Sequence, residues 1–98
     1  MNRSVVWSSD ALDDLDGAIR YIADDNPKAA LSGAAEIREA GRRLEEMPTG
    51  RPGRRTGTYE KVATGLPYIL AYALHKYPDI GDAVVILRVI DTSRDWPI

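Results

Sequence analysis

The sequence has no cysteine, no phenylalanine and a single histidine. Without cysteine the chain forms no disulfide, thiolate metal site or cysteine nucleophile, a composition that fits a reducing cytosol. We expect the lone His75 to be structural or exposed, because general acid–base catalysis needs a second group that sets the tautomer and pKa of the imidazole. Metal-ligand spacings, glycine-rich phosphate loops and nucleophile-elbow serines are absent too. We therefore predict no catalytic residue, no metal site and no cofactor.

Long apolar segments are also missing. No run approaches the ~20 apolar residues of a membrane span, and residues 1–7 lack the apolar core of a signal peptide. We therefore expect a cytoplasmic protein with no membrane partner. The 98 residues fit a single domain over residues 1–98, long enough for a core between two layers.

The chain carries little charge of one sign overall, since its formal net charge is -2. It therefore lacks the positive charge typical of nucleic-acid-binding proteins, and we expect no direct DNA binding. The charge is nonetheless unevenly distributed. Residues 10–25 contain six aspartates and one arginine, whereas residues 38–61 contain seven basic residues and four glutamates. A surface with two such ends more often meets a protein with complementary patches than a uniform polyanion.

The first half of the sequence predicts a strand followed by two helices. Residues 4–8 form a short β-branched and aromatic run, and the serines at 8 and 9 are good helix caps. A helix from about residue 10 to residue 24 is indicated by apolar side chains at intervals of three and four: Leu12, Leu15, Ile19 and Ile22. Asn26-Pro27 then starts a second helix that runs to about residue 47. The connection is so short that the helices must form an antiparallel hairpin.

Small side chains dominate the apolar stripe of the second helix, notably Ala30, Gly33, Ala34 and Gly41. A glycine in a helix interior costs on the order of 1 kcal/mol relative to alanine, so such a stripe needs a reason. We expect a tight contact with the first helix, and a groove where the small residues leave the surface unfilled.

The second half predicts strands. Residues 50–57 form a turn region. The region contains three arginines beside glycines and a proline, and it contains no acidic residue. Strands are expected over residues 58–64, 68–75 and 83–90, joined by short turns. The last of these is apolar on both faces apart from Arg88, which predicts a central strand buried on both sides. The fold class is therefore α+β: an N-terminal strand, an antiparallel helical hairpin, then a three-stranded antiparallel meander (β-α-α-β-β-β).

Basic side chains on or near the meander are the remaining candidates for function. Arg88 is the most informative, since a charge within an apolar strand must point outward or be paired. A salt bridge to Glu60 or Asp91 and a functional role are both open. Tyrosines at 59, 68 and 72 fit sheet packing, and Trp96 is either a lid over the core or an anchor for another protein.

Four short blocks in order along the chain resemble the ParE/RelE superfamily of toxins from bacterial type II toxin–antitoxin modules. They are DNPKAA at 25–30, GRPGR at 50–54, PYILAY at 67–72, and VILRVI at 85–90 ahead of RDWP at 94–97. The resemblance covers nearly the whole chain. It implies a helical hairpin packed on an antiparallel sheet, a cognate antitoxin whose C-terminal segment wraps and neutralises the toxin, and growth inhibition when the antitoxin is lost.

Two activities divide the superfamily. The resemblance to RelE-like members implies a small endoribonuclease that cuts mRNA on the ribosome. The resemblance to ParE-like members, which are similar in fold, implies an inhibitor of DNA gyrase that is not a nuclease. Cleavage of RNA needs a base, a proton donor and a cation at one phosphate. This chain is acidic overall and ends in Trp96-Pro97-Ile98, without the terminal His-Tyr or tyrosine of RelE-like members. The ParE-like interpretation is favoured, with a RelE-like ribonuclease and an inactive toxin-like interaction domain as alternatives.

The resemblance and the residue pattern together predict two surfaces. The target-binding surface, with gyrase as the expected target, comprises basic residues and one aromatic: Arg51, Arg54, Arg55, Arg88, Arg94 and Trp96. The antitoxin-binding surface is expected on the small-residue face of the second helix: Ala30, Gly33, Ala34, Ile37 and Gly41.

Overall fold

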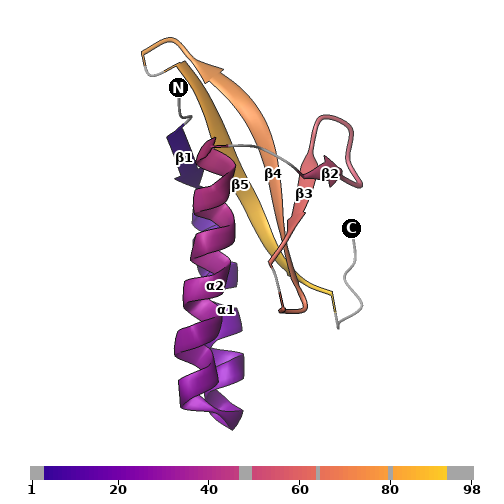
Figure 1. The fold of residues 1–98 in the computed structure, drawn as a ribbon. Helices are drawn as coiled ribbons and strands as arrows, with labels where there is room; N and C mark the ends of the chain where they lie inside the picture. The colour runs from indigo at the N-terminus through magenta and orange to yellow at the C-terminus, as the bar shows by residue number, and fades with distance from the viewer. Residues whose placement is uncertain (1–3, 47–49, 64, 80, 93–98) are drawn as a thin grey trace.

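The computed structural model describes residues 4–46, 50–63, 65–79 and 81–92, and it has the predicted α+β class with one additional short strand. The elements are β1 (Ser4–Trp7), α1 (Ser9–Asp25), α2 (Pro27–Glu46), β2 (Arg51–Pro52), β3 (Tyr59–Val62), β4 (Tyr68–Tyr77) and β5 (Gly81–Asp91). In Figure 1 α2 lies in front of α1, and β3 and β4 lie to the right of the helices. Neither helix in the described ranges is long and apolar enough to span a membrane.

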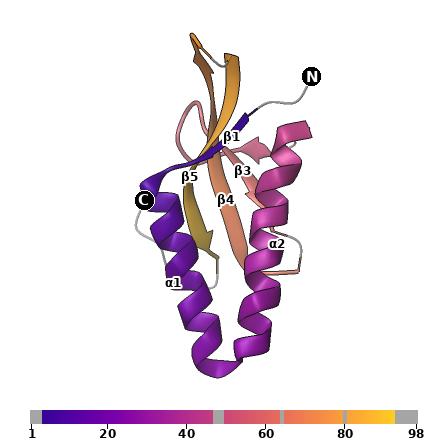
Figure 2. The ribbon, with the colours of Figure 1, turned by 90° about the vertical axis from the view of Figure 1, so that its left-hand side faces the viewer.

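The ends of the helices follow from their capping residues. Ser8 precedes α1, and its hydroxyl accepts a hydrogen bond from the backbone N–H of Ala11 at 3.0 Å. Asn26 serves both helices. Its backbone N–H donates to the carbonyl of Ile22 at 2.8 Å, and its side-chain oxygen accepts from the N–H of Ala29 at 3.1 Å. One residue thus ends α1 and begins α2, and this produces the predicted antiparallel hairpin (Figure 2).

The five strands form one sheet in the order β1-β5-β4-β3-β2. The meander of β3, β4 and β5 is antiparallel, as predicted, while β1 lies parallel to β5 with Ser4 opposite Ala83. The sequence left the place of the first strand open. The expected turn region contains β2, a two-residue strand that pairs with β3 and that the sequence did not indicate.

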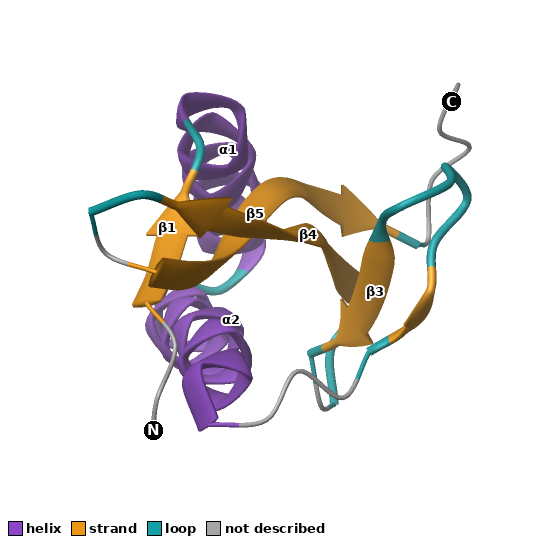
Figure 3. Ribbon diagram, turned by 90° about the horizontal axis from the view of Figure 1, so that it is seen from above, coloured by secondary structure: helices purple, strands orange, loops and turns teal. Residues whose placement is uncertain are grey.

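The helices lie in front of the sheet in Figure 2 and cover one of its faces, and the core lies between the two layers. Figure 3, seen from above, shows β3 on the side of the molecule away from the helices. Its largest fully buried side chains are Tyr72, Ile37, Leu44, Leu70, Ile86 and Val84. The prediction that residues 83–90 form a strand buried on both sides is wrong. On the face without helices, Val85 and Ile90 are only partly buried and Arg88 is exposed, because no second layer covers that face in the described part of the chain.

The small residues of α2 face inward. A Cβ atom built at Gly33 would lie 3.2 Å from Ile22 of α1, and one at Gly41 would lie 2.7 Å from the ring of Trp7. The expected close contact between the helices is therefore present at Gly33. The expected open groove is absent, since the stripe packs against α1, β1 and the sheet, and its side chains are buried.

Candidate functional site

A groove of about 390 Å³ lies across the sheet, with one wall at each side. One wall comes from the loop between β2 and β3, through Arg54, Arg55 and Thr58. The other comes from the start of α1, through Ser8 and Asp10. Because β1 and β2 are the two edge strands of the sheet, these walls rise at its opposite edges.

The floor of the groove is the sheet face that the helices leave uncovered. It is formed by Glu60 of β3, Ala71 of β4, and Leu87, Arg88 and Ile90 of β5. Glu60 pairs with Ala71 across the strands, and Ala71 pairs with Arg88, so these side chains share one face. The floor is therefore mostly apolar, with charged groups at its edges.

Arg88 is held by Asp14 of α1. Its Nε and Nη2 atoms donate to the two carboxylate oxygens of Asp14 at 2.7 and 3.0 Å, a bidentate pair. This hydrogen bonding raises the pKa of Arg88, and the charge of Asp10 adds to the effect. The side chain of Asp14 is only 13% exposed, whereas that of Arg88 is 49% exposed. The sequence-based candidates for this salt bridge, Glu60 and Asp91, are wrong.

The same part of β5 contains a β-bulge. Ala71 is opposite Arg88 and Tyr72 is opposite Ile86, so Leu87 is the extra residue. Ser8 accounts for two backbone carbonyls at the bulge: its N–H donates to Ile86 at 2.9 Å and its hydroxyl donates to Leu87 at 3.0 Å.

Asp14 binds a third backbone group at the bulge, since its Oδ2 accepts a hydrogen bond from the backbone N–H of Val89 at 3.0 Å. The beginning of α1 thus satisfies the backbone groups that a bulge removes from the strand ladder, and it fixes the position of the Arg88 side chain.

The wall formed by the loop between β2 and β3 lies beside a buried acidic side chain, that of Glu60. The side chain of Glu60 is 8% exposed, and its oxygens lie 3.5 Å from Arg51 and 3.9 Å from Arg54. Arg55, in contrast, forms no ion pair with any residue that the structure describes. Arg55 is therefore the cation of this wall that is available to a partner.

The loop that carries these arginines is braced internally. The N–H of Gly53 donates to the carbonyl of Thr58 at 2.8 Å, and the hydroxyl of Thr58 donates to the carbonyl of Arg55 at 2.7 Å. At its start, the N–H of Gly50 donates to the hydroxyl of the buried Tyr72 at 2.9 Å. The arginines therefore project from a defined turn, not from a linker of arbitrary shape.

No histidine or tyrosine of the described residues lines the groove beside Arg88, where the titratable groups other than arginine are the carboxylates of Asp10 and Glu60. His75 packs edge-on against Tyr77, with ring centroids 4.4 Å apart, and neither lines the groove. Tyr59 stacks on Tyr72 at 5.6 Å as part of the sheet packing predicted for these tyrosines. The same ranges contain no group of three or more acidic, histidine or cysteine residues that could hold a metal ion.

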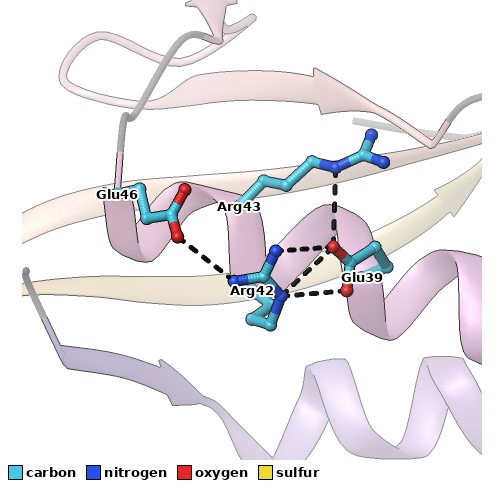
Figure 4. Close-up of polar contacts among 4 residues, drawn as sticks. All are labelled: Glu39, Arg42, Arg43 and Glu46. Carbon is cyan, nitrogen blue, oxygen red and sulfur yellow. Dashed lines mark hydrogen bonds and ion pairs between the residues drawn. The ribbon is translucent and has the colours of Figure 1, made fainter.

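A second charged cluster lies on the exposed surface of α2 (Figure 4). Arg42 donates to Glu39 at 2.7 Å and approaches Glu46 at 3.4 Å, while Arg43 lies 3.6 Å from Glu39. The hydrogen bonds from Arg42 lower the pKa of Glu39 and raise that of Arg42. Two acids and two bases neutralise one another here, so this cluster presents no excess charge to a partner.

The structure brings Arg54, Arg55 and Arg88 of the predicted target-binding surface into one groove and places Arg51 beside them through its pairing with Glu60. Arg94 and Trp96 lie outside the described residues. Sequence reasoning missed the contribution of Asp10 to the groove, because Asp10 is distant in sequence from the arginines.

The predicted antitoxin-binding positions are all buried within the chain. They are Ala30, Gly33, Ala34, Ile37 and Gly41, which pack against α1 and the sheet. An exposed apolar side chain of the same helix is Leu31, at 77% exposure.

Comparison with known proteins places this geometry in context. The model of the family described as "ParE toxin of type II toxin-antitoxin system, parDE" matches residues 5–96. Among curated proteins, "Putative toxin Y4kP" of Sinorhizobium fredii is 36% identical over 96 residues, which cover 97% of this chain and 94% of the relative.

Two solved structures share the fold. The chromosomal ParDE toxin–antitoxin system from P. aeruginosa matches with a TM-score of 0.80 at 22% identity, over 91% of this chain and 95% of that chain. The toxin–antitoxin complex RelBE2 from Mycobacterium tuberculosis matches with a TM-score of 0.64 at 27% identity, over 93% and 99% respectively.

Proposed function

The chain belongs to the ParE toxin family of type II toxin–antitoxin systems, and from that premise we propose that it inhibits growth by binding DNA gyrase and is neutralised by a cognate antitoxin. The family match over residues 5–96 carries this proposal. The similarity to two solved toxin–antitoxin structures supports an antitoxin partner. The proposed target surface is the groove with Arg54, Arg55 and Arg88.

The composition of the groove favours an inhibitor over a ribonuclease. Cutting RNA through its 2′-hydroxyl requires a base, a proton donor and a cation within reach of the same phosphate. The guanidinium of Arg88 is paired with Asp14, and although Arg55 and the carboxylates of Asp10 and Glu60 also line the groove, no histidine or tyrosine in the described ranges does so as a proton donor. A surface that binds a protein needs neither a free cation at a phosphate nor a proton-transfer pair.

The test compares two activities of the purified chain. Gyrase supercoiling of relaxed plasmid is measured at increasing chain concentration, and cleavage of ribosome-bound mRNA is measured with the same preparation. We expect loss of supercoiling, restored by the antitoxin encoded beside the chain, and intact message. Message cleavage with gyrase unaffected would replace this proposal with the ribonuclease. Neither activity, with harmless expression, would favour an inactive interaction domain.

A matched pair of variants connects the activity to the groove. The double change Arg54→Ala with Arg55→Ala removes two groove arginines and is expected to weaken inhibition of supercoiling. Arg38→Ala removes an exposed arginine of α2 that does not line the groove, and it should leave inhibition unchanged. Equal effects of the two changes would place the target surface elsewhere.

A further inference from the structure

We propose that the groove docks a peptide segment of the target protein that carries charges of both signs around an apolar side chain. The acidic residue of that segment faces Arg55, its basic residue faces Asp10, and its apolar side chain lies on the floor between them. This inference rests on the proposed function, since the segment belongs to the protein that the chain inhibits.

The two walls of the groove carry opposite unpaired charges. Arg55 has no ion-pair partner among the described residues, and Asp10 on the other wall forms no ion pair with them either, although its charge also acts on Arg88. The other charged side chains of the groove form ion pairs within the chain: Arg88 pairs with Asp14, and Arg54 pairs with Glu60. Electrostatic complementarity at an interface selects a partner with the reverse arrangement of charges.

The floor favours a protein segment for a second reason. Ala71, Leu87 and Ile90 are partly buried and lie on a sheet face that the helices leave open. An apolar side chain placed there would remove this surface from water, and the volume of about 390 Å³ is within the range of sites that bind a side chain or a small ligand. Apolar anchors within a polar rim are the usual composition of a protein interface.

A nucleic-acid backbone fits the groove poorly. It is a uniform polyanion whose binding depends on the neutralisation of phosphates by lysine and arginine. Here it would meet the carboxylates of Asp10 and Glu60, while the guanidinium of Arg88 is already bound to Asp14. The two kinds of ligand therefore differ in the effect that they predict for a change at Asp10.

The experiment reverses each rim charge separately. Arg55→Glu and Asp10→Lys are compared with Arg38→Glu and Asp24→Lys, which make the same charge changes at exposed positions outside the groove. The readouts are the expression level that arrests growth and the concentration that half-inhibits gyrase supercoiling. Far-UV circular dichroism and urea unfolding confirm that each variant is folded.

For a segment of mixed charge, both groove variants lose potency, by roughly fivefold each, and the controls match the unchanged protein. The double variant Arg55→Glu with Asp10→Lys, whose net charge is unchanged, stays at least as weak as the single variants. A polyanionic ligand predicts a different pattern: Asp10→Lys gains potency and the double variant returns close to the original potency. That pattern, or groove variants indistinguishable from the controls, would overturn the inference.

The two readouts separate this inference from the proposed function. Growth arrest without inhibition of gyrase removes gyrase as the target, and the groove variants then still test the docking segment through the growth readout. Inhibition of gyrase that all groove variants retain leaves the proposed function in place and removes the groove as its site. A chain that arrests no growth and leaves gyrase unaffected overturns both.

Discussion

Three glycines within the helices differ in what an added methyl group would meet. At Gly17 of α1 a Cβ atom would have no neighbour within 4 Å. At Gly33 of α2 it would lie 3.2 Å from Cδ1 of Ile22. At Gly41 it would lie 2.7 Å from Cζ2 of Trp7 and 3.1 Å from Cδ1 of Ile86. Changing each glycine to alanine therefore separates helix propensity from packing.

The propensity gain is similar at the three positions, about 1 kcal/mol in a helix interior. Gly17→Ala keeps this gain, since nothing opposes it. Gly33→Ala keeps most of it, because the flexible end of one isoleucine can move by a few tenths of an ångström. Gly41→Ala places a methyl group against a rigid indole ring as well as Ile86, and overpacking of this kind costs about 1–3 kcal/mol. That cost offsets the propensity gain and leaves a net loss of up to about 2 kcal/mol.

Urea unfolding and thermal melts, both followed by far-UV circular dichroism, measure these differences. We expect the order of stability Gly17→Ala, Gly33→Ala, unchanged protein, Gly41→Ala. In a domain of this size each 1 kcal/mol corresponds to roughly 4–8 °C in Tm. If Gly41→Ala were as stable as Gly17→Ala, Trp7 would not be fixed between α2 and the sheet, and the packing described for the stripe would be incorrect.

Three further changes test other contacts. Asp14→Ala should destabilise the fold by about 1–3 kcal/mol, because it leaves the N–H of Val89 without its acceptor; urea unfolding measures this, and a change no larger than that of Asp13→Ala would contradict it. Tyr72→Phe should cost about 1 kcal/mol and speed hydrogen exchange at the amide of Gly50, which loses its acceptor. Unaltered exchange there would show that the amide has another partner. A carbon-detected NMR titration should give Glu39 a pKa below its usual 4.5, because the hydrogen bond from Arg42 stabilises the carboxylate. The lowered pKa means that this contribution to stability is present above the unfolded pKa and is lost as the pH falls through the folded one. High salt should move the pKa back toward 4.5, and a value insensitive to salt would contradict the ion pair.

The helical half of the fold could be predicted because its signals are local. Asn26 and Pro27 mark the boundary between the helices within two residues, and the structure ends α1 and begins α2 there. The meander was predictable for the same reason, since turn residues separate strongly apolar runs. The two-residue β2 was not, because Arg51-Pro52 has no strand pattern and becomes a strand through its pairing with β3.

The site was less predictable, because its contacts join distant parts of the sequence. Arg88 could be identified as a residue that needs a partner, but its partner Asp14 is 74 positions away and looked like one of several solvated aspartates. The bulge at Leu87 had no sequence signal either, since the run from Val84 to Ile90 is apolar apart from Arg88 and contains no glycine or proline. Which arginines are paired and which one is free depends on this tertiary geometry.

The parallel pairing of β1 with β5 means that the first described strand cannot join the sheet until the last described strand has been synthesised. Residues 4–7 are synthesised well before their partners at 83–86, which follow 79 positions later in the chain. At ~5–20 residues per second this separation lasts for several seconds, during which the nascent helical hairpin has no sheet to cover it. A polypeptide truncated before residue 83 would therefore lack both the partner strand of β1 and the part of the groove floor that Leu87, Arg88 and Ile90 supply, and could not assemble the groove.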